Sequence, residues 1–168
     1  MKNFALISSC VVLLILIVYL FIDTPSNTTP CRVAAEFLPT INQDAAEEIT
    51  IEDGFSVCIS VDHLNKTTIV FLKDNKVVHN EWFTNNSTSD VSWSANSTEE
   101  YGLIALHVVE PTIKKVEVMG LSNDDTHWIE YNDSRYVIGV SKSLSRNPVI
   151  IKGYSSQNEL VYQNVKEE

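Results

Sequence analysis

From Ile49 to the C-terminus, the sequence repeatedly alternates apolar and polar residues with a period of two. In the run FSVCISVD the apolar residues share one parity: Phe55, Val57, Ile59 and Val61. Successive side chains of a β-strand point to opposite faces, so this period predicts half-buried strands. About nine short runs of this kind, separated by turn sequences, predict a mainly β domain built as an antiparallel β-sandwich.

Local signals refine this prediction at four places. The pair Asp74-Asn75 tolerates positive φ and predicts a two-residue hairpin turn. The run Ile104–Val109 is apolar at both parities except for its histidine, which predicts a strand in the middle of a sheet. Ahead of the strands, Cys31–Phe37 and Asn42–Glu48 have the composition of short helical turns.

The N-terminal segment 4–22 is apolar and carries no formal charge over 19 residues. At about 1.5 Å per residue, a helix of this length spans the hydrocarbon core of a bilayer. Signal peptides end in small residues before their cleavage site, whereas this segment ends in the bulky run Val18–Ile22. We predict an uncleaved signal-anchor, that is, a single-pass transmembrane helix; the alternative is a cleaved signal that releases a secreted protein.

The charges that flank this segment predict its orientation. Lys2 and the α-amino group precede it, and Asp23 follows it. The positive-inside rule then places the N-terminus in the cytoplasm and residues 23–168 in an extracytoplasmic compartment.

Three regions follow from these signals: the membrane anchor 1–22, a tether with a short helical segment 23–48, and an extracytoplasmic β-sandwich domain 49–168. Without Lys2, the outer part has 11 Lys and Arg against 22 Asp and Glu, a formal charge of −11. This charge repels nucleic acid and anionic lipid headgroups, so no nucleic-acid partner is expected.

Two cysteines lie in the predicted outer part, Cys31 and Cys58. Cys58 has the polar parity of its strand, where a segment packed over that face would bring Cys31 to it. We predict a disulfide between them, which closes a loop of about 27 residues and contributes roughly 3 kcal/mol. The alternative is two unpaired cysteines, one of them packed as a small hydrophobic residue.

Catalytic and metal-binding patterns are weak. His79 and Glu81 share a strand face, but no HExxH or paired-cysteine motif accompanies them. The acidic run Asn123–Asp125 lacks the spacing of a calcium loop and is typical of a turn. Ser141 lies in an elbow-like GVSKS sequence inside a strand pattern, and we interpret it as a strand residue. The sequence therefore predicts no catalytic residue, no metal site and no cofactor.

The best candidate for a recognition surface is aromatic. Trp82, Trp93 and Tyr101 surround the polar loop Thr84–Asp90, and aromatic residues beside adaptable polar ones serve both protein and glycan contacts. The alternative role of these aromatic residues is core packing. The outer part also contains six Asn-x-Ser/Thr sequons, more than chance predicts.

The runs PTIKKVEV, HWIEY and PVIIKGYSSQNELVYQ within residues 100–163 resemble small signal-anchored or secreted envelope proteins of Gram-positive bacteria with a β-rich outer domain. The chain differs from them at Ser155–Asn158, where such tails have an Asp and Gly turn, and in its two extra cysteines. The resemblance implies that the sequons are unglycosylated, and it assigns no functional residue.

Together these features predict a membrane-anchored extracytoplasmic domain, not an enzyme, that binds a protein or glycan at the cell envelope. One competing hypothesis is a membrane-anchored hydrolase whose His and carboxylate site is assembled by strand pairing. Another is a subunit of a membrane complex that associates through the segment 4–22.

Overall fold

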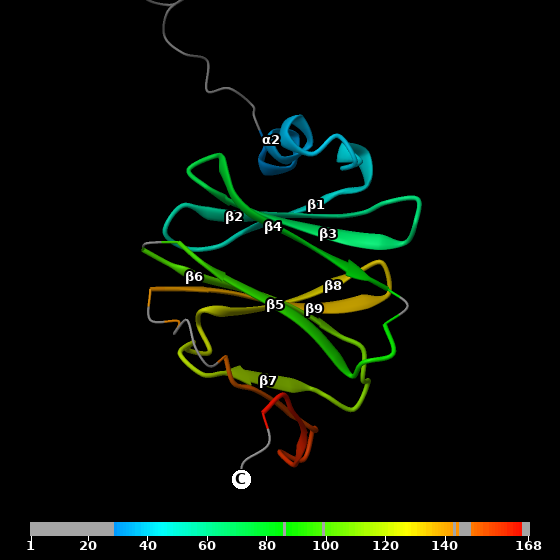
Figure 1. Cartoon of the computed structure of the whole chain (residues 1–168), viewed down its shortest axis with the longest axis vertical. Helices are drawn as coiled ribbons and strands as arrows, with labels where there is room; N and C mark the ends of the chain where they lie inside the picture. The colour runs from blue at the N-terminus through cyan, green and yellow to red at the C-terminus, as the bar shows by residue number, and fades with distance from the viewer. Residues whose placement is uncertain (1–28, 86, 99, 143, 145–148, 166–168) are drawn as a thin grey trace, which may run out of the picture.

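The computed structural model describes residues 29–168 except 86, 99, 143, 145–148 and 166–168. The described chain is mainly antiparallel β-structure, as predicted, with eleven strands in three sheets. The sheets stack in layers, and one short helix lies over the first of them (Figure 1). The expected sandwich is therefore present between the first two sheets, and a third, smaller sheet adds a layer that the sequence did not predict.

Sheet A contains the first four strands in the order β1-β2-β3-β4. Their bounds are β1 Glu47–Thr50, β2 Phe55–Val61, β3 Lys66–Lys73 and β4 Lys76–Thr84. The turn between β3 and β4 is the predicted two-residue hairpin, and both of its residues, Asp74 and Asn75, have positive φ. One register shift interrupts the pairing of β3 with β4, next to Phe71.

Helix α2 (Pro30–Phe37) and the 3-10 turn η1 (Gln43–Ala45) cover the outer face of sheet A. Thr29 caps the helix, because its side chain accepts a hydrogen bond from the backbone N–H of Arg32, and Pro30 fits the first turn. The helix agrees with the prediction. The second predicted helical segment is shorter than expected, since β1 begins at Glu47.

Sheet B has the order β5-β6-β9-β8. Its strands are β5 Val91–Ser97, β6 Gly102–Val108, β8 Thr126–Tyr131 and β9 Ser134–Ser141. Every residue of β6 is buried, so the prediction that this run lies in the middle of a sheet is confirmed. Two-sided burial explains why its apolar residues do not alternate with polar ones.

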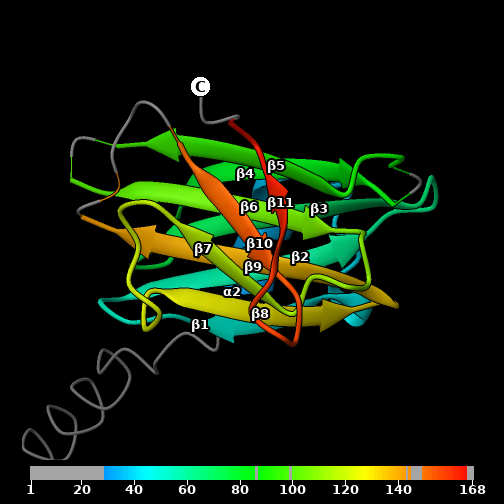
Figure 2. The ribbon, with the colours of Figure 1, turned by 90° about the horizontal axis from the view of Figure 1, so that it is seen from below.

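Sheet C lies on the other face of sheet B and has the order β11-β10-β7. Its strands are four residues long: β7 Lys115–Val118, β10 Ile151–Tyr154 and β11 Leu160–Gln163. They cross sheet B at an angle, with β1 and β8 along one side of the domain and β4 and β5 along the opposite side (Figure 2).

Three apolar clusters hold the layers together. The cluster between sheets A and B includes Phe71, Phe83 and Tyr136, and the cluster between sheets B and C includes Leu106 and Ile151. A third lies beneath α2. No helix among the described residues is both long enough and apolar enough to cross a membrane. The predicted anchor, residues 4–22, lies outside the described residues.

Candidate functional site

The three aromatic residues predicted to form a recognition surface lie in different places. Trp82 pairs with Thr68 on the outer face of sheet A and is 56% exposed. Trp93 pairs with Leu106 on the face of sheet B that is turned toward sheet C, and it is 41% exposed. Tyr101 lies between β5 and β6. Since the core between sheets A and B separates the two tryptophans, the three side chains do not form one continuous surface.

Tyr101 borders cavities at one end of the sandwich formed by sheets A and B. Its ring meets that of Phe55 edge-on, with centroids 4.7 Å apart. One cavity, of about 220 Å³, lies on one side of this aromatic pair, and a second, of about 350 Å³, lies on the other. The second is lined mainly by carbon and also contacts Val78 and Thr98. A group the size of one side chain or one sugar ring fits either space.

Two lysines approach the same aromatic pair. The Lys73 ammonium lies 4.8 Å from the Phe55 ring centroid and 5.6 Å from that of Tyr101. The Lys142 ammonium lies 5.4 Å from the Tyr101 centroid. Neither lysine forms a salt bridge with any residue that the structure describes. Both charges are therefore held over aromatic rings, where a bound anion or carbonyl group can reach them.

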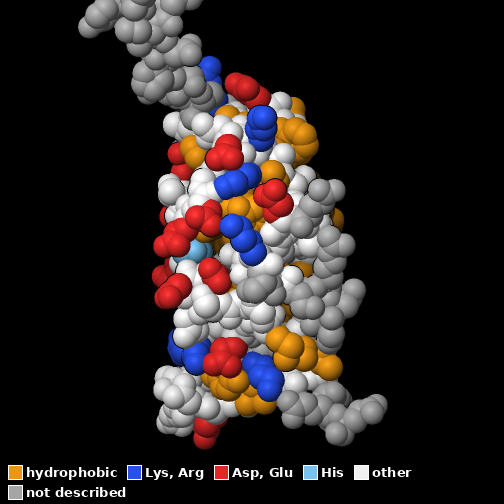
Figure 3. All heavy atoms as spheres, turned by 90° about the vertical axis from the view of Figure 1, so that its left-hand side faces the viewer, with side chains coloured by type: hydrophobic (Ala, Val, Ile, Leu, Met, Phe, Trp, Pro, Cys, Tyr) orange, Lys and Arg blue, Asp and Glu red, His pale blue; other side chains and the backbone are white. Residues whose placement is uncertain are grey.

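The larger set of charges at this end is negative. The cavity of about 220 Å³ is lined by His127, the buried Ser141 and four carboxylates, which belong to Glu52, Asp53, Asp124 and Asp125. Figure 3 looks onto this end and shows acidic (red) and basic (blue) side chains close together around hydrophobic ones. A zwitterionic or strongly polar group is complementary to this mixture of charges.

The acidic loop here behaves as a turn, as predicted from its sequence. The backbone N–H of Ser122 donates to Asp125 Oδ2 at 3.3 Å, and the backbone N–H of Asp125 donates to Ser122 Oγ at 3.2 Å. No group of three or more His, Cys, Asp or Glu side chains is arranged to hold a metal ion within the described ranges. Ser141 ends β9 opposite Gly102, in the strand position expected for it.

His79 and Glu81 belong to a polar cluster that joins β4 to β5. Ser94 Oγ donates to Glu81 Oε2 at 2.5 Å, and His79 Nε2 lies 3.6 Å from the same oxygen. The backbone N–H of Ser97 donates to Asn96 Oδ1 at 2.7 Å, so the amide nitrogen of Asn96 faces His79 Nδ1, 2.8 Å away.

This arrangement defines the roles of the cluster. Because Asn96 donates to Nδ1, the neutral imidazole of His79 carries its proton on Nε2, directed at Glu81. A serine nucleophile needs the imidazole as its base, with the carboxylate behind it. Here the carboxylate lies between the serine and the imidazole, so the geometry favours a tie between two sheets over the hydrolase hypothesis.

A buried polar network, which no sequence pattern indicated, closes the other end of the sandwich. The hydroxyls of Thr67 and Tyr136 lie 2.6 Å apart, and both reach Asn85 Oδ1, at 2.9 and 3.0 Å. Asn85 Nδ2 donates to Asn65 Oδ1 at 3.0 Å. Burial raises the pKa of the Tyr136 hydroxyl. The amide of the Asn85 sequon is therefore engaged within the fold.

His107 is buried beside this network. Its ring stacks on Tyr136, with centroids 5.0 Å apart, and its Nδ1 has no hydrogen-bond partner in the described part of the chain. Burial lowers the pKa of His107, and the nearby Arg135 guanidinium lowers it further. The imidazole is consequently a neutral part of the core near pH 7.

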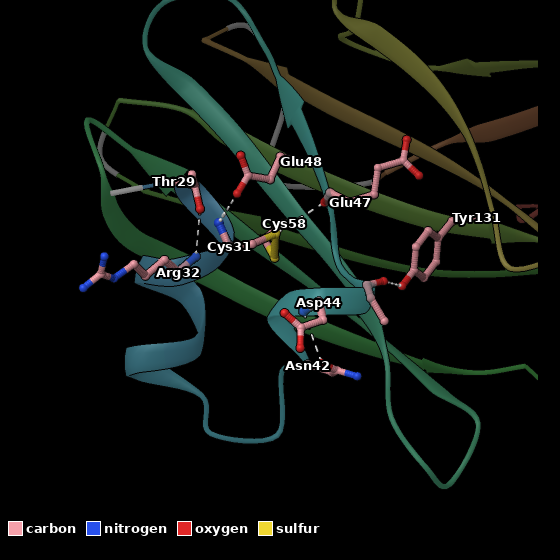
Figure 4. Close-up of a disulfide and its surroundings, with 10 residues drawn as sticks. Thr29, Cys31, Arg32, Asn42, Asp44, Glu47, Glu48, Cys58 and Tyr131 are labelled. Atoms are coloured by element: carbon pink, nitrogen blue, oxygen red, sulfur yellow. Dashed lines mark hydrogen bonds between the residues drawn. A yellow bond between two sulfur atoms is a disulfide. The ribbon is translucent and has the colours of Figure 1, made fainter. Parts of the chain in front are cut away.

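The two cysteines that were predicted to pair are joined by a disulfide that ties α2 to β2 (Figure 4). Their Cα atoms are 5.0 Å apart. The backbone N–H of Cys31 also donates to Glu48 Oε1 at 3.1 Å, and Tyr131 donates through its hydroxyl to the backbone oxygen of Ala45. The disulfide and the Glu48 contact fix α2 on sheet A, and the Tyr131 contact joins η1 to β8 of sheet B.

Comparisons with known proteins place no family on this architecture. The chain matches no protein-family model, no curated protein and no solved structure.

Proposed function

We propose that the chain is a membrane-anchored extracytoplasmic domain that binds a protein or glycan at the cell envelope through the end of the sandwich around Tyr101. The observation that supports this most is the pair of cavities that share the Phe55–Tyr101 contact. Lysines with no ion pair among the described residues, an aromatic pair and carboxylates are gathered there, and such convergence is typical of binding sites. The lining offers contacts to one side chain or sugar ring of a larger partner.

The position of the N-terminus is compatible with this role. The described domain begins at Thr29, on the α2 side of the stack (Figure 1). Six residues, 23–28, separate it from the predicted anchor, and six extended residues span at most about 20 Å. In this proposal α2 lies near the membrane, sheet C is the most distant layer, and the Tyr101 end is accessible from the side.

Site-specific photo-cross-linking tests the binding role. We would place a photoreactive phenylalanine analogue at position 101 of the full chain, in membranes of its native host, and use the analogue at position 128 as the matched control. Both positions hold partly exposed aromatic residues, but Trp128 lines neither cavity, because it lies on the face of β8 opposite to that of His127. We expect an adduct at position 101 alone, and its loss when Lys73→Glu and Lys142→Glu are introduced.

Equal adducts at positions 101 and 128, or an adduct that survives both lysine changes, would contradict a specific partner at this end. The anchor is tested separately by the intact mass of the protein from membrane and medium fractions. A full-length mass in the membrane supports the anchored form. A mass lacking about the first 25 residues in the medium would establish the secreted alternative.

A further inference from the structure

The six edge strands of the three sheets differ in how they are protected from pairing with another strand. Natural sheets protect their edges with charged residues, bulges or short strands. Four of the edges carry a charged residue: β1 (Glu47 and Glu48), β4 (Lys76 and Glu81), β7 (Lys115 and Glu117) and β8 (Glu130). The edge strand β11 is uncharged, but it is four residues long and its register with β10 is irregular.

Strand β5 has none of these protections. Its sequence, VSWSANS, contains no charged residue and no proline, and its seven residues pair with β6 without a register shift. Figure 2 shows β5 as the outermost strand of sheet B on its side of the domain. A long, regular and uncharged edge of this kind is a template for another strand.

The hydrogen-bond phase of β5 identifies the backbone groups on its outer side. The backbone N–H of Thr98 donates to the backbone oxygen of Tyr101 across the turn, and the backbone oxygen of Asp90 accepts from the N–H of Val109 at the other end of the strand. Because the hydrogen bonds of an antiparallel pair alternate, the backbone groups of the even-numbered residues between them bond to β6, and those of the odd-numbered residues point to the outer edge. The N–H groups of Trp93 and Ala95 have no partner within the described ranges.

We propose that the outer edge of β5 binds β5 of a second copy of this chain, antiparallel and centred on Ser94. This register places Trp93 opposite Ala95 of the other copy, and both residues have outward-facing backbone groups, so the pair exchanges both of its hydrogen bonds. The large indole then covers a small side chain. Ser92 lies opposite the other copy's Asn96, and no like charges meet.

The twofold symmetry of this pairing explains why a second copy is the occupant. The strand is self-complementary about its central residue, which a closed two-fold interface requires. The net charge of −10 on each chain opposes association. However, β5 is uncharged, and salt screens charges that lie more than about 8 Å away at physiological ionic strength. The inference does not depend on which ligand the Tyr101 end binds.

Disulfide trapping tests the register. In a Cys10→Ser background, Ser94→Cys places two cysteines opposite each other at a non-hydrogen-bonded pair, with Cα atoms about 4.5 Å apart, within disulfide reach. Ser92→Cys is the matched control. It lies on the same face and also loses one side-chain hydrogen bond, but the Cα atoms of the two cysteines are then about 14 Å apart. We expect mild oxidation of the full chain in membranes to give a covalent dimer with Ser94→Cys alone.

A second measurement needs no added cysteine. Light scattering of the full chain in detergent is expected to give a dimer that Trp93→Lys weakens at least about tenfold. Trp128 lies on the opposite edge of sheet B and is 40% exposed, against 41% for Trp93. Trp128→Lys should therefore change the affinity of the dimer less than about twofold. A chain that stays monomeric, equal trapping at positions 92 and 94, trapping of a different protein at position 94, or equal effects of the two tryptophan changes would overturn the proposal.

Discussion

The two ends of the sandwich formed by sheets A and B each contain a tyrosine, but the two side chains differ in burial and in hydrogen bonding. Tyr136 is fully buried, and its hydroxyl lies within hydrogen-bond distance of Thr67 and Asn85. Tyr101 is partly exposed, packs against Phe55, and its hydroxyl has no hydrogen-bond partner among the described residues. One phenol serves the fold, while the other is available to a ligand.

The charged groups follow the same division. At the closed end, His107 is a buried, neutral ring, and the Arg135 guanidinium donates to the backbone oxygens of Ile113 and Glu110 at 2.7 and 2.6 Å. At the open end, Lys73 and Lys142 lie over aromatic rings without an ion pair in the described chain. Polar groups whose partners are internal stabilise the domain, whereas groups without internal partners define where binding energy is available.

The largest expected effect comes from removing one oxygen atom at each end. Tyr136→Phe removes two close hydrogen-bond contacts of a buried side chain, so we expect it to lower the free energy of unfolding by roughly 1–2 kcal/mol. Tyr101→Phe removes a hydroxyl that has no internal partner and should change this free energy by less than about 0.5 kcal/mol. Urea denaturation of the full chain in detergent, followed by tryptophan fluorescence, measures both.

Equal losses of stability in the two tyrosine variants would show that the ends do not differ as described. Photo-cross-linking from position 101 in the Tyr136→Phe variant separates this result from a folding effect, because Tyr136 is distant from the Tyr101 cavities and its substitution should leave partner contacts there unchanged. A loss of cross-linking in this variant would instead mean that the open end depends on the closed one.

Sequence patterns were sufficient for the elements whose signal is local. The strand patterns predicted β2, β3 and β4 of sheet A, the Asp74-Asn75 pair predicted its hairpin, and the parity of Cys58 predicted the face on which the segment with Cys31 packs. Strand β1 begins at Glu47, inside the second segment that was predicted to be helical. The continuous apolar run of β6 indicated a strand in the middle of a sheet, which is its place in sheet B. Each of these signals is contained within a few neighbouring residues.

The third sheet and the two ends depend on contacts between distant residues. Sheet C pairs residues 115–118 with 151–154, and a strand pattern does not indicate with which distant strand it pairs. Tyr136, Thr67 and Asn85 come from three separate segments, so no spacing announces their network. The expected aromatic surface of Trp82, Trp93 and Tyr101 relied on nearness in sequence. This nearness is not preserved in space, because the chain passes from sheet A to sheet B after Thr84.

The next largest effect concerns pH and again separates the two ends. The pKa of His107 is lower in the folded chain than its ordinary value of 6.5, so below about pH 6.5 the unfolded chain binds more protons. Stability is therefore complete above that value and is lost as the pH falls toward the folded-state pKa, by at most about 1.4 kcal/mol per pH unit for this one group.

Denaturation curves at a series of pH values between 5 and 7.5 check this sign. We expect His107→Gln to reduce the slope of stability against pH in this range, whatever its effect on stability at neutral pH. His127→Gln, at the open end, is the matched substitution with which the slope of His107→Gln is compared. A His107→Gln variant with an undiminished slope would assign the acid sensitivity to other groups.

A further small effect on stability is expected for Lys73 at the open end, where the same substitution should have a large effect on binding. Lys73→Met keeps much of the apolar stem and removes an ammonium that interacts with the Phe55 and Tyr101 rings in a partly exposed position. Such contacts contribute about 0.5–1 kcal/mol, so urea denaturation should show a loss no larger than that. Photo-cross-linking from position 101 should nevertheless fall strongly, because the charge has no internal ion pair and is available to the partner. A loss of stability well above 1 kcal/mol with unchanged cross-linking would reverse the argument, since Lys73 would then act on the fold as Tyr136 does at the closed end.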